Sequence, residues 1–378
     1  MSCNLKKICG GCPHRDMDEQ SYRQMKEKKF LAVIQKLNSK KHKICPSIFI
    51  KDGSRRRATF AFEYKKNKLI LGFNEESSHK IVDVPFCPLL TPEINKCLTD
   101  IRRTLTEICC EKWTEKKGKK ILTKNIADGD IFICEADNGL DIVLETSDNL
   151  VLNHRMIISE FVQQNSSVIR FSHRTSAFAD SETIVEKTPP LINIGQYKIY
   201  IPAGTFLQPS KAGQEALGKL VVHYLKGIKG KVADLFCGVG TFSYLLALEN
   251  VGEIISVDSS KQLLSGFKDS VNKNQIKNIT IQNKNLFKYP LDENELKGLD
   301  AVLFDPPRAG AKAQCLKIAE SSEKPRIIVA VSCNPQTFVN DADILISGGY
   351  DLKEITLVDQ FIYSNHSELV AFFTKRNM

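Results

Sequence analysis

The second half of the chain alternates apolar, β-branched runs with helix-like segments, and this pattern constrains the fold more than any other feature. The runs are KVADLF (231–236), EIISVD (253–258), ITIQNK (279–284), AVLFD (301–305) and RIIVAVS (326–332). Continuously apolar strands that alternate with helices are typical of a doubly wound, mainly parallel sheet covered on both faces. We therefore predict an α/β domain over residues 206–378.

The first half, residues 1–205, has a different texture and is predicted to form a smaller, strand-rich α+β domain. Phe60, Phe62 and Tyr64 alternate with small or polar residues, which is the period-two signature of a half-buried strand. A helix is predicted over residues 18–37, where apolar residues recur at helical spacing. This helix could pack on the C-terminal domain.

The formal net charge is +9, from 53 Lys+Arg against 44 Asp+Glu, which is a moderate basic surplus. Basic clusters such as Arg55, Arg56 and Arg57 suit phosphate contacts, although a solvated surface would explain them equally well. No apolar run is long enough for a membrane helix, and the N-terminal residues lack the apolar core of a signal peptide. We therefore expect a cytoplasmic protein without a membrane partner.

The chain has 12 cysteines, but a disulfide framework does not fit a protein of this size without a secretion signal. Free cysteines of this kind usually behave as small hydrophobic residues. Six are therefore predicted to be buried: Cys45, Cys97, Cys109, Cys110, Cys134 and Cys315.

A glycine-rich turn, ADLFCGVGTF, includes the end of the first predicted strand of the α/β domain. Gly238 and Gly240 let the backbone approach a ligand at the carboxyl edge of the sheet, and Asp258 ends the next strand, where it can accept hydrogen bonds from ribose hydroxyls. Nucleotide dehydrogenases share this layout, but Ser243 stands where their third glycine is expected. The D-x-F-x-G-x-G form is similar to the turn of class I methyltransferases. We favour a bound nucleoside cofactor over a purely structural turn.

Three further segments lie next to predicted strands at the same edge of the sheet: DPPRAG, SCNP and HSE. Cys333 follows one strand and Glu368 precedes another. Cysteine and glutamate are the residue types of a nucleophile and a general base. Taken singly, an inert buried cysteine and a solvated glutamate remain the alternatives.

Together, FLQ (206–208), DLFCGVGTF, DPPRAG (305–310), SCNP (332–335) and HSE (366–368) resemble the uracil-5-methyltransferase family that acts on ribosomal and transfer RNA. Their order and spacing match throughout the predicted α/β domain, and the first half of the chain also fits. The resemblance implies a class I, Rossmann-like domain that transfers a methyl group from S-adenosylmethionine to carbon 5 of a uridine.

By position in this resemblance, Cys333 matches the nucleophile that adds to carbon 6 of uracil, and Glu368 matches the base that removes the carbon-5 proton. Asp258 replaces the commoner Glu, which shortens the reach to the ribose. The residues at positions where family members contact S-adenosylmethionine are Gln208, Phe236, Thr241, Asp258, Asn285 and Asp305.

Cys3, Cys9 and Cys12 form a C-x5-C-x2-C pattern, and Cys87 lies far along the chain in VPFCP. Four thiolates can hold a zinc ion or an iron–sulfur cluster, and the spacing alone does not choose between them. A frayed terminus that binds nothing is a third alternative. Because many family members bind a [4Fe-4S] cluster through this arrangement, the resemblance implies such a cluster in the first domain, as a structural element or a support for RNA docking.

The resemblance favours 23S ribosomal RNA as the substrate, because cluster cysteines are typical of members that act on large-subunit ribosomal RNA. Transfer RNA is the alternative. A non-catalytic iron–sulfur RNA-binding protein is a further alternative, which would predict loss of Cys333, Glu368 or the glycine turn. Methylation of an exocyclic amine is disfavoured, because Arg308 stands where those enzymes place an aromatic residue. We expect a monomer that binds RNA.

Overall fold

The computed structural model describes residues 3–39, 42–117 and 120–376. These residues form two compact units, each assembled from segments that are not contiguous in the sequence. The first unit comprises Met1–Asp16, Asp52–Ile192 and Ile201–Ser210, and the second unit comprises Met17–Lys51, Asn193–Tyr200 and Lys211–Met378.

The second unit contains a nine-stranded sheet, whose strands among the described residues follow the order β1-β19-β20-β18-β17-β14-β15-β16, with β2 also paired to β19. The strands are β1 (Lys43–Ile44), β2 (Ile48–Phe49), β14 (Lys231–Leu235), β15 (Glu253–Asp258), β16 (Ile279–Asn283), β17 (Leu299–Phe304), β18 (Ile327–Ser332), β19 (Tyr350–Asp359) and β20 (Glu368–Lys375). Strands β14 to β18 pair in parallel. Strand β20 runs antiparallel to both β18 and β19.

The sheet grows in two directions from β14. The chain first adds β15 and β16 on one side and then returns to add β17 and β18 on the other. Ligands of doubly wound sheets bind outside the carboxyl ends of the strands at such a switch point, here between β14 and β17. The predicted α/β fold is confirmed, with all five predicted strands present and a sheet that is mixed because β20 is antiparallel.

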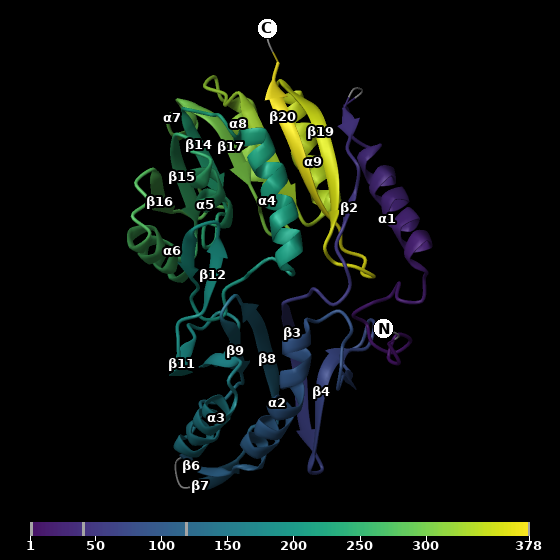
Figure 1. Ribbon diagram of the computed structural model, residues 1–378, viewed down its shortest axis with the longest axis vertical. Coiled ribbons are helices and arrows are strands. Elements are labelled where there is room, and N and C mark those ends of the chain that lie inside the picture. The colour runs from purple at the N-terminus through teal and green to yellow at the C-terminus, as the bar shows by residue number, and fades with distance from the viewer. Residues whose placement is uncertain (1–2, 40–41, 118–119, 377–378) are drawn as a thin grey trace. The chain divides into compact units, whose positions relative to one another are not determined.

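Helices cover both faces of this sheet (Figure 1). One face carries α4 (Lys211–Leu225), α5 (Thr241–Leu248) and α6 (Lys261–Lys273), and the other carries α1 (Glu19–Ile34), α7 (Glu293–Leu296), α8 (Lys312–Glu320) and α9 (Pro335–Ser347). Helix α1 packs against α9. Phe30 of α1 and Phe338 of α9 share an apolar core with Ala233 and Leu235 of β14. Because successive strand residues point to opposite faces, Asp234 points toward α5.

The first unit is built on a seven-stranded sheet in the order β11-β10-β9-β8-β3-β4-β5, in which only β9 and β10 pair in parallel. Helices α2 (Pro92–Cys110) and α3 (Leu152–Gln164) pack against this sheet and each other. The strands are β3 (Arg57–Lys65), β4 (Lys68–Asn74), β5 (Ile81–Asp83), β8 (Asp128–Ala136), β9 (Gly139–Glu145), β10 (Val168–Arg174) and β11 (Glu182–Glu186).

Two short hairpins complete the secondary structure of the described residues. They are β6 (Trp113–Lys117) with β7 (Lys120–Lys124), and β12 (Leu191–Ile194) with β13 (Tyr197–Tyr200). Within the described ranges, every helix is too short or too polar to cross a lipid bilayer.

The burial of the scattered cysteines matches the prediction only in part. Cys97, Cys109 and Cys315 are buried, and Cys45 and Cys134 are half-buried. The prediction is wrong for Cys110, which is exposed. Cys110 is the last residue of α2, and its adjacent partner Cys109 occupies the buried helix face instead.

Gly240 is predicted to tolerate no side chain, because its φ of 83° is left-handed and a Cβ there would lie 2.2 Å from the Phe267 ring. Gly227 is a matched control with a φ of 84°, where no atom of the described residues lies within 4 Å of an added Cβ. Gly227→Ala should cost only backbone strain, about 1–2 kcal/mol. Gly240→Ala should cost about 3 kcal/mol or more, because the clash adds to the strain. Urea unfolding measures both costs, and equal values would contradict the steric argument.

Candidate active site

The glycine turn joins β14 to α5 through three residues with positive φ. Phe236 follows β14 with a φ of 60°, and Gly238 and Gly240 have φ values of 56° and 83°. A phenylalanine in the left-handed region is strained, and such strain is often found at functional sites. The turn brings Thr241, the first residue of α5, to the carboxyl end of β14.

Asp258, at the end of β15, is fixed against this turn. Its Oδ2 accepts a hydrogen bond from the backbone N–H of Gly238 at 3.0 Å, and its Oδ1 accepts one from the N–H of Ser260 at 2.9 Å. Each carboxylate oxygen has a second lone pair. The side chain is therefore oriented by the backbone and can still accept hydrogen bonds from a ligand.

Asn285 follows β16 and organises the next loop. Its Oδ1 accepts hydrogen bonds from the backbone N–H groups of Phe287 at 3.1 Å and Lys288 at 3.2 Å. The Phe287 ring is 49% exposed, and its centroid lies 5.4 Å from that of Phe236. Phe236, Asp258 and Asn285 thus follow or end three neighbouring parallel strands at one edge of the sheet.

Asp234, inside β14, is a buried carboxyl and the first residue of the D-x-F-x-G-x-G pattern. Its Oδ2 accepts a hydrogen bond from Ser243 Oγ at 2.5 Å, and Ser243 Oγ lies 2.7 Å from Ser256 Oγ. Burial, and more weakly the carboxyl of Asp305, raise the pKa of Asp234 to about 7 against the lowering effect of the Ser243 bond. The switch point therefore contains an acid poised near neutral pH.

The three segments DPPRAG, SCNP and HSE meet in the structure. The backbone carbonyl of Arg308 accepts hydrogen bonds from Asn334 Nδ2 at 3.1 Å and Thr337 Oγ1 at 3.3 Å. Arg308 Nη2 lies 3.1 Å from His366 Nε2. Arg308 therefore contacts both the loop after β18 and the loop before β20.

Cys333 and Glu368 are brought together by the pairing of β18 with β20. Ser332, the last residue of β18, pairs with Leu369. The residues next to this pair are Cys333, directly after β18, and Glu368, the first residue of the antiparallel β20. Cys333 is half-buried, whereas Glu368 is only 3% exposed and its Oε2 accepts a hydrogen bond from Gln360 Nε2.

Burial, two neighbouring carboxyl groups and one guanidinium influence the pKa of this cysteine. Burial raises the pKa of Cys333 to about 11, and the carboxyls of Glu368 and Asp305 contribute, whereas the guanidinium of Arg308 lowers it. Burial also raises the pKa of Asp305 to about 7. The pKa of Glu368 lies well above its usual value, first through burial and then through Asp305. The thiol is therefore protonated at neutral pH, and a bound cation would favour ionisation of all three groups.

Gln208 belongs to the first unit, whereas the other predicted cofactor contacts belong to the second. The backbone carbonyl of Gln208 accepts a hydrogen bond from Arg56 Nε at 3.0 Å, and Arg57 Nη1 donates to the carbonyl of Leu207 at 3.0 Å. Arg56 is only 4% exposed. The predicted phosphate contact is therefore wrong for Arg56, because its guanidinium is buried and holds the chain around Gln208.

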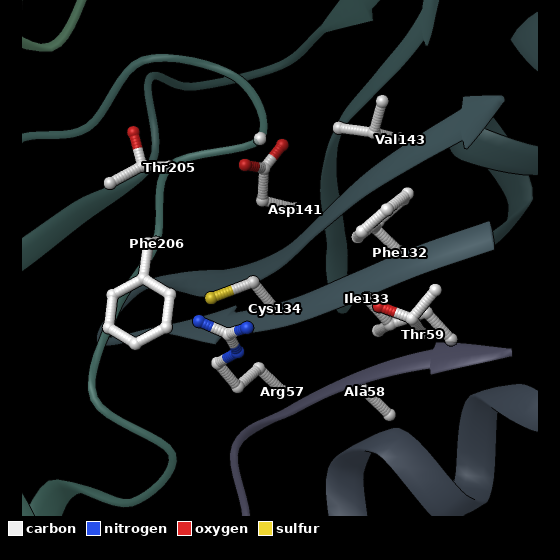
Figure 2. Close-up of a pocket in the computed structure, with 11 residues that line it drawn as sticks. Arg57, Ala58, Thr59, Phe132, Ile133, Cys134, Asp141, Val143, Thr205 and Phe206 are labelled. Carbon is white, nitrogen blue, oxygen red and sulfur yellow. The ribbon is translucent and has the colours of Figure 1, made fainter. Parts of the chain in front are cut away.

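A pocket of 230 Å³ opens in the first unit beside this segment (Figure 2). The Arg57 guanidinium lies 4.1 Å from the centroid of the Phe206 ring, which is 58% exposed. Asp141, which also lines the pocket, accepts hydrogen bonds from Arg170 Nε at 2.9 Å and Arg170 Nη2 at 2.8 Å. The negative charge of Asp141 is therefore compensated, and the lining includes the guanidinium of Arg57 and the rings of Phe132 and Phe206 beside small and aliphatic side chains.

The four cysteines of the predicted cluster site lie in the first unit, and their thiols interact electrostatically. The pKa of Cys12 is raised to about 12, first by burial and then by Cys87, with smaller contributions from Cys9 and Cys3. The segment is folded, since Cys9 forms a β-bridge with Glu75. However, the described residues contain no group of three or more His, Cys, Asp or Glu side chains spaced to hold a metal ion.

Comparisons with known proteins agree with these features. A family model described as tRNA (uracil-5-)-methyltransferase matches residues 153–376. A protein of Agrobacterium fabrum named as an RNA methyltransferase is 34% identical over 374 residues, which cover 98% of this chain and 83% of that protein. The 23S rRNA (uracil(1939)-C(5))-methyltransferase RlmD of Shewanella frigidimarina is 28% identical, covering 98% of this chain and 81% of its own.

Among solved structures, the tRNA (uracil-54, C5)-methyltransferase of Pyrococcus abyssi in complex with S-adenosyl-L-homocysteine has a TM-score of 0.73 at 22% identity. The match covers 96% of this chain and 86% of that structure. The fold is therefore that of the α/β methyltransferases. The chain belongs to the RNA (uracil-5)-methyltransferase family and is an S-adenosylmethionine-dependent RNA methyltransferase.

Alkylation of Cys333 should report its acidic surroundings. Iodoacetamide reacts with thiolates, so the rate of modification should rise with pH. The midpoint of this rise should lie at about 11, above the ordinary thiol pKa of 9.0. Glu368→Gln should lower this midpoint, because it removes a negative charge that disfavours the thiolate. Peptide mass spectrometry after timed pulses of reagent measures the rate. Glu323→Gln, at an exposed position, is the control, and an unshifted midpoint in Glu368→Gln would contradict the electrostatic contact.

Proposed function

We propose that the protein methylates carbon 5 of a uridine in RNA through a transient bond between Cys333 Sγ and carbon 6 of the ring. The observation that carries this proposal is the register of β18 and β20, which brings Cys333 and Glu368 to adjacent strand ends. The chemistry needs one thiolate and one base, and these two residues provide them. Membership of the uracil-5-methyltransferase family supports uridine as the target.

The proposed reaction begins when Cys333 loses its proton to solvent and the thiolate adds to carbon 6. The electron pair of the C5–C6 double bond forms an enolate, and carbon 5 takes the methyl group from the sulfonium of the donor, releasing the thioether S-adenosylhomocysteine. Glu368 then removes the proton from carbon 5. The C5–C6 double bond re-forms and the C6–S bond breaks, which returns the thiolate.

The environment of each group fits its proposed role. The raised pKa of Glu368 makes its carboxylate a stronger base than an exposed glutamate once it is ionised. The raised pKa of Cys333 is opposed by Arg308. S-adenosylmethionine supplies the methyl group together with a positive charge, which favours both ionised groups in a site rich in carboxyls.

The methyl donor is proposed to bind at the edge formed by the glycine turn. Asp258 would accept hydrogen bonds from the ribose hydroxyls, using the lone pairs that the backbone N–H groups leave. The residues proposed to contact the donor are Gln208, Phe236, Thr241, Asp258, Asn285 and Asp305.

We infer that 23S ribosomal RNA is the substrate, because the RlmD relative aligns over almost the whole chain. Transfer RNA is the alternative that the description of the family model suggests. Residues 1–205 are proposed to form the RNA-binding region. The exposed ring of Phe206, which belongs to the same unit as Arg57 and lies over its guanidinium, supports RNA binding by this unit, because aromatic and guanidinium surfaces stack unpaired bases.

Cys3, Cys9, Cys12 and Cys87 are proposed to hold a [4Fe-4S] cluster. Four thiols in electrostatic contact, all free of disulfides, fit such a group. In a cubane cluster each thiolate binds a different iron, so the sulfurs lie farther apart than around one zinc ion. The proposal rests on this cysteine set and on the family resemblance, since the described residues contain no group of three or more side chains spaced to hold a metal ion. The cluster would cross-link the N-terminal segment to the Cys87 loop.

RNA that contains 5-fluorouracil should trap the proposed adduct. Fluorine at carbon 5 cannot be removed as a proton, so elimination stops and the protein should stay bonded to the RNA when S-adenosylmethionine is present. A denaturing gel detects the species, and peptide mapping should locate the bond at Cys333. Cys333→Ala should give no adduct, and failure of the wild-type protein to form one would sink the proposal.

On ordinary RNA, Glu368→Gln should accumulate the methylated adduct, because the final proton removal loses its base. Turnover should fall by about 10²–10⁴-fold. Glu323→Gln should turn over like the wild type. If turnover of Glu368→Gln collapses without an adduct, Glu368 acts at another step.

Protein purified without oxygen should contain iron and sulfide in about a 4:4 ratio and absorb visible light as a brown chromophore. Cys87→Ser should lose most of the iron, because one of the four ligands is removed. Cys97→Ser, at another buried cysteine of the same unit, should retain it. Stoichiometric zinc in place of iron would overturn the cluster assignment.

A further inference from the structure

Helix α1 carries a lysine on its buried face. Tyr22, Lys26, Phe30 and Ile34 recur every four residues and are the buried residues of the helix. Lys26 is only 1% exposed. Burying an ammonium group is costly unless it is paired and hydrogen-bonded, so its partners indicate what this position does.

Among the described residues, the hydrogen-bond and ion-pair partners of Lys26 Nζ lie in or directly before the loop between β19 and β20, residues 360–367. Nζ lies 3.1 Å from Oδ1 of Asp359, the last residue of β19. It also donates to the backbone carbonyls of Ser364, at 3.2 Å, and of His366. The ammonium therefore binds one end of the loop through a carboxylate and the other end through two carbonyls.

Tyr22, one turn earlier on α1, completes this contact. Its hydroxyl donates to Asp359 Oδ2 at 2.7 Å, and its ring centroid lies 4.8 Å from that of Tyr363. Tyr363 has a φ of 59°, a strained conformation that persists only where the surroundings enforce it. Helix α1 thus contacts the loop and holds it in this strained conformation.

The same loop sets the position of Glu368. Gln360, its first residue, donates its side-chain N–H to Glu368 Oε2, and Glu368 itself follows the last residue of the loop. His366, whose carbonyl Lys26 binds, meets Arg308 through its ring. A shift of the loop would therefore move the carboxylate of Glu368 relative to Cys333.

We propose that Lys26 is a positioning residue that holds the β19–β20 loop so that Glu368 can take the carbon-5 proton. This inference rests on the proposed function, in which Glu368 is the base. It predicts a defect in the step that needs Glu368, with the preceding addition of Cys333 intact. A shift of about 1 Å in a base is enough for a large loss of rate.

Lys26→Met tests the proposal, because it keeps an unbranched apolar stem as far as Cε and removes the ammonium. Turnover on ordinary RNA should fall about tenfold or more, with the methylated adduct accumulating. The rate of adduct formation on 5-fluorouracil RNA should stay within about twofold of wild type, since that reaction stops before the base acts. Lys28→Met, at an exposed position of the same helix, should match the wild type in both assays.

A double-mutant cycle separates positioning from general stability. In a Glu368→Gln background, Lys26→Met should lower turnover by less than about twofold, because the step it affects has already lost its base. Independent, multiplicative losses would overturn the proposal, as would wild-type turnover in Lys26→Met. An equal loss of 5-fluorouracil adduct and turnover would also overturn it, since that result indicates a damaged fold.

If Lys26→Met does not fold, Tyr22→Phe decides the question by the same comparison. It removes only the hydroxyl that donates to Asp359, so turnover should fall severalfold while adduct formation with 5-fluorouracil RNA is kept. Unchanged turnover in that variant would overturn the proposal. Absence of the 5-fluorouracil adduct in the wild-type protein is a separate outcome, which would overturn the proposed function and this inference with it.

Discussion

The insertion of β20 between β18 and β19, antiparallel to both, is the constraint on which the site in the second unit depends. In a parallel sheet the carboxyl ends of all strands lie at the same edge. The side chains at that edge therefore come only from residues that end or follow strands. An antiparallel strand begins at the edge where its neighbours end. The first residue of β20, Glu368, therefore lies beside the residue after β18, Cys333. The sheet hydrogen bonds of β18 and β20 thus fix the backbone directly beside both reactive groups.

The acids around this edge explain why the site should be suited to a cationic methyl donor. Asp234, Asp305 and Glu368 all have raised pKa values because burial disfavours their charged forms. The pKa of Cys333 is raised in the same way, and the guanidinium of Arg308 lowers it. A bound positive charge would shift each of these equilibria toward the ionised form, so binding and deprotonation are coupled. A neutral ligand of the same shape would leave the acids protonated and would gain less binding free energy from them.

The sequence predicts the strands well because burial on both faces leaves a direct mark on composition. Each of the five apolar runs became a strand with its ends shifted by at most two residues. The segment LVAFFT (369–374), which lies in β20, is also apolar, but nothing in its composition says that it enters the sheet between two other strands. That placement is a tertiary property, and the proximity of Cys333 and Glu368 follows from it. Sequence motifs could suggest this pair only through a family resemblance.

Two features that the sequence does not reveal have a common physical origin, since they concern charged residues whose partners are distant in sequence. Arg56 lies in a run of three arginines that looks like a phosphate-binding surface, yet it is buried against the carbonyl of Gln208. Lys26 lies in the charged stretch KEKK, where it looks no different from Lys28. Only the four-residue spacing with Tyr22 and Phe30 marks its helix face.

Lys26 also bears on where the methyltransferase unit begins. A boundary at residue 206 would separate Lys26 from Asp359, which is fully buried at the end of β19. Removing one partner of a buried ion pair leaves an uncompensated charge, which costs about 3–5 kcal/mol. The same cut would remove β1 and β2, which pair with β19. The physical unit that can support the chemistry of Glu368 therefore includes the segment Met17–Lys51, although most of the chain's first half lies between that segment and the strands it completes.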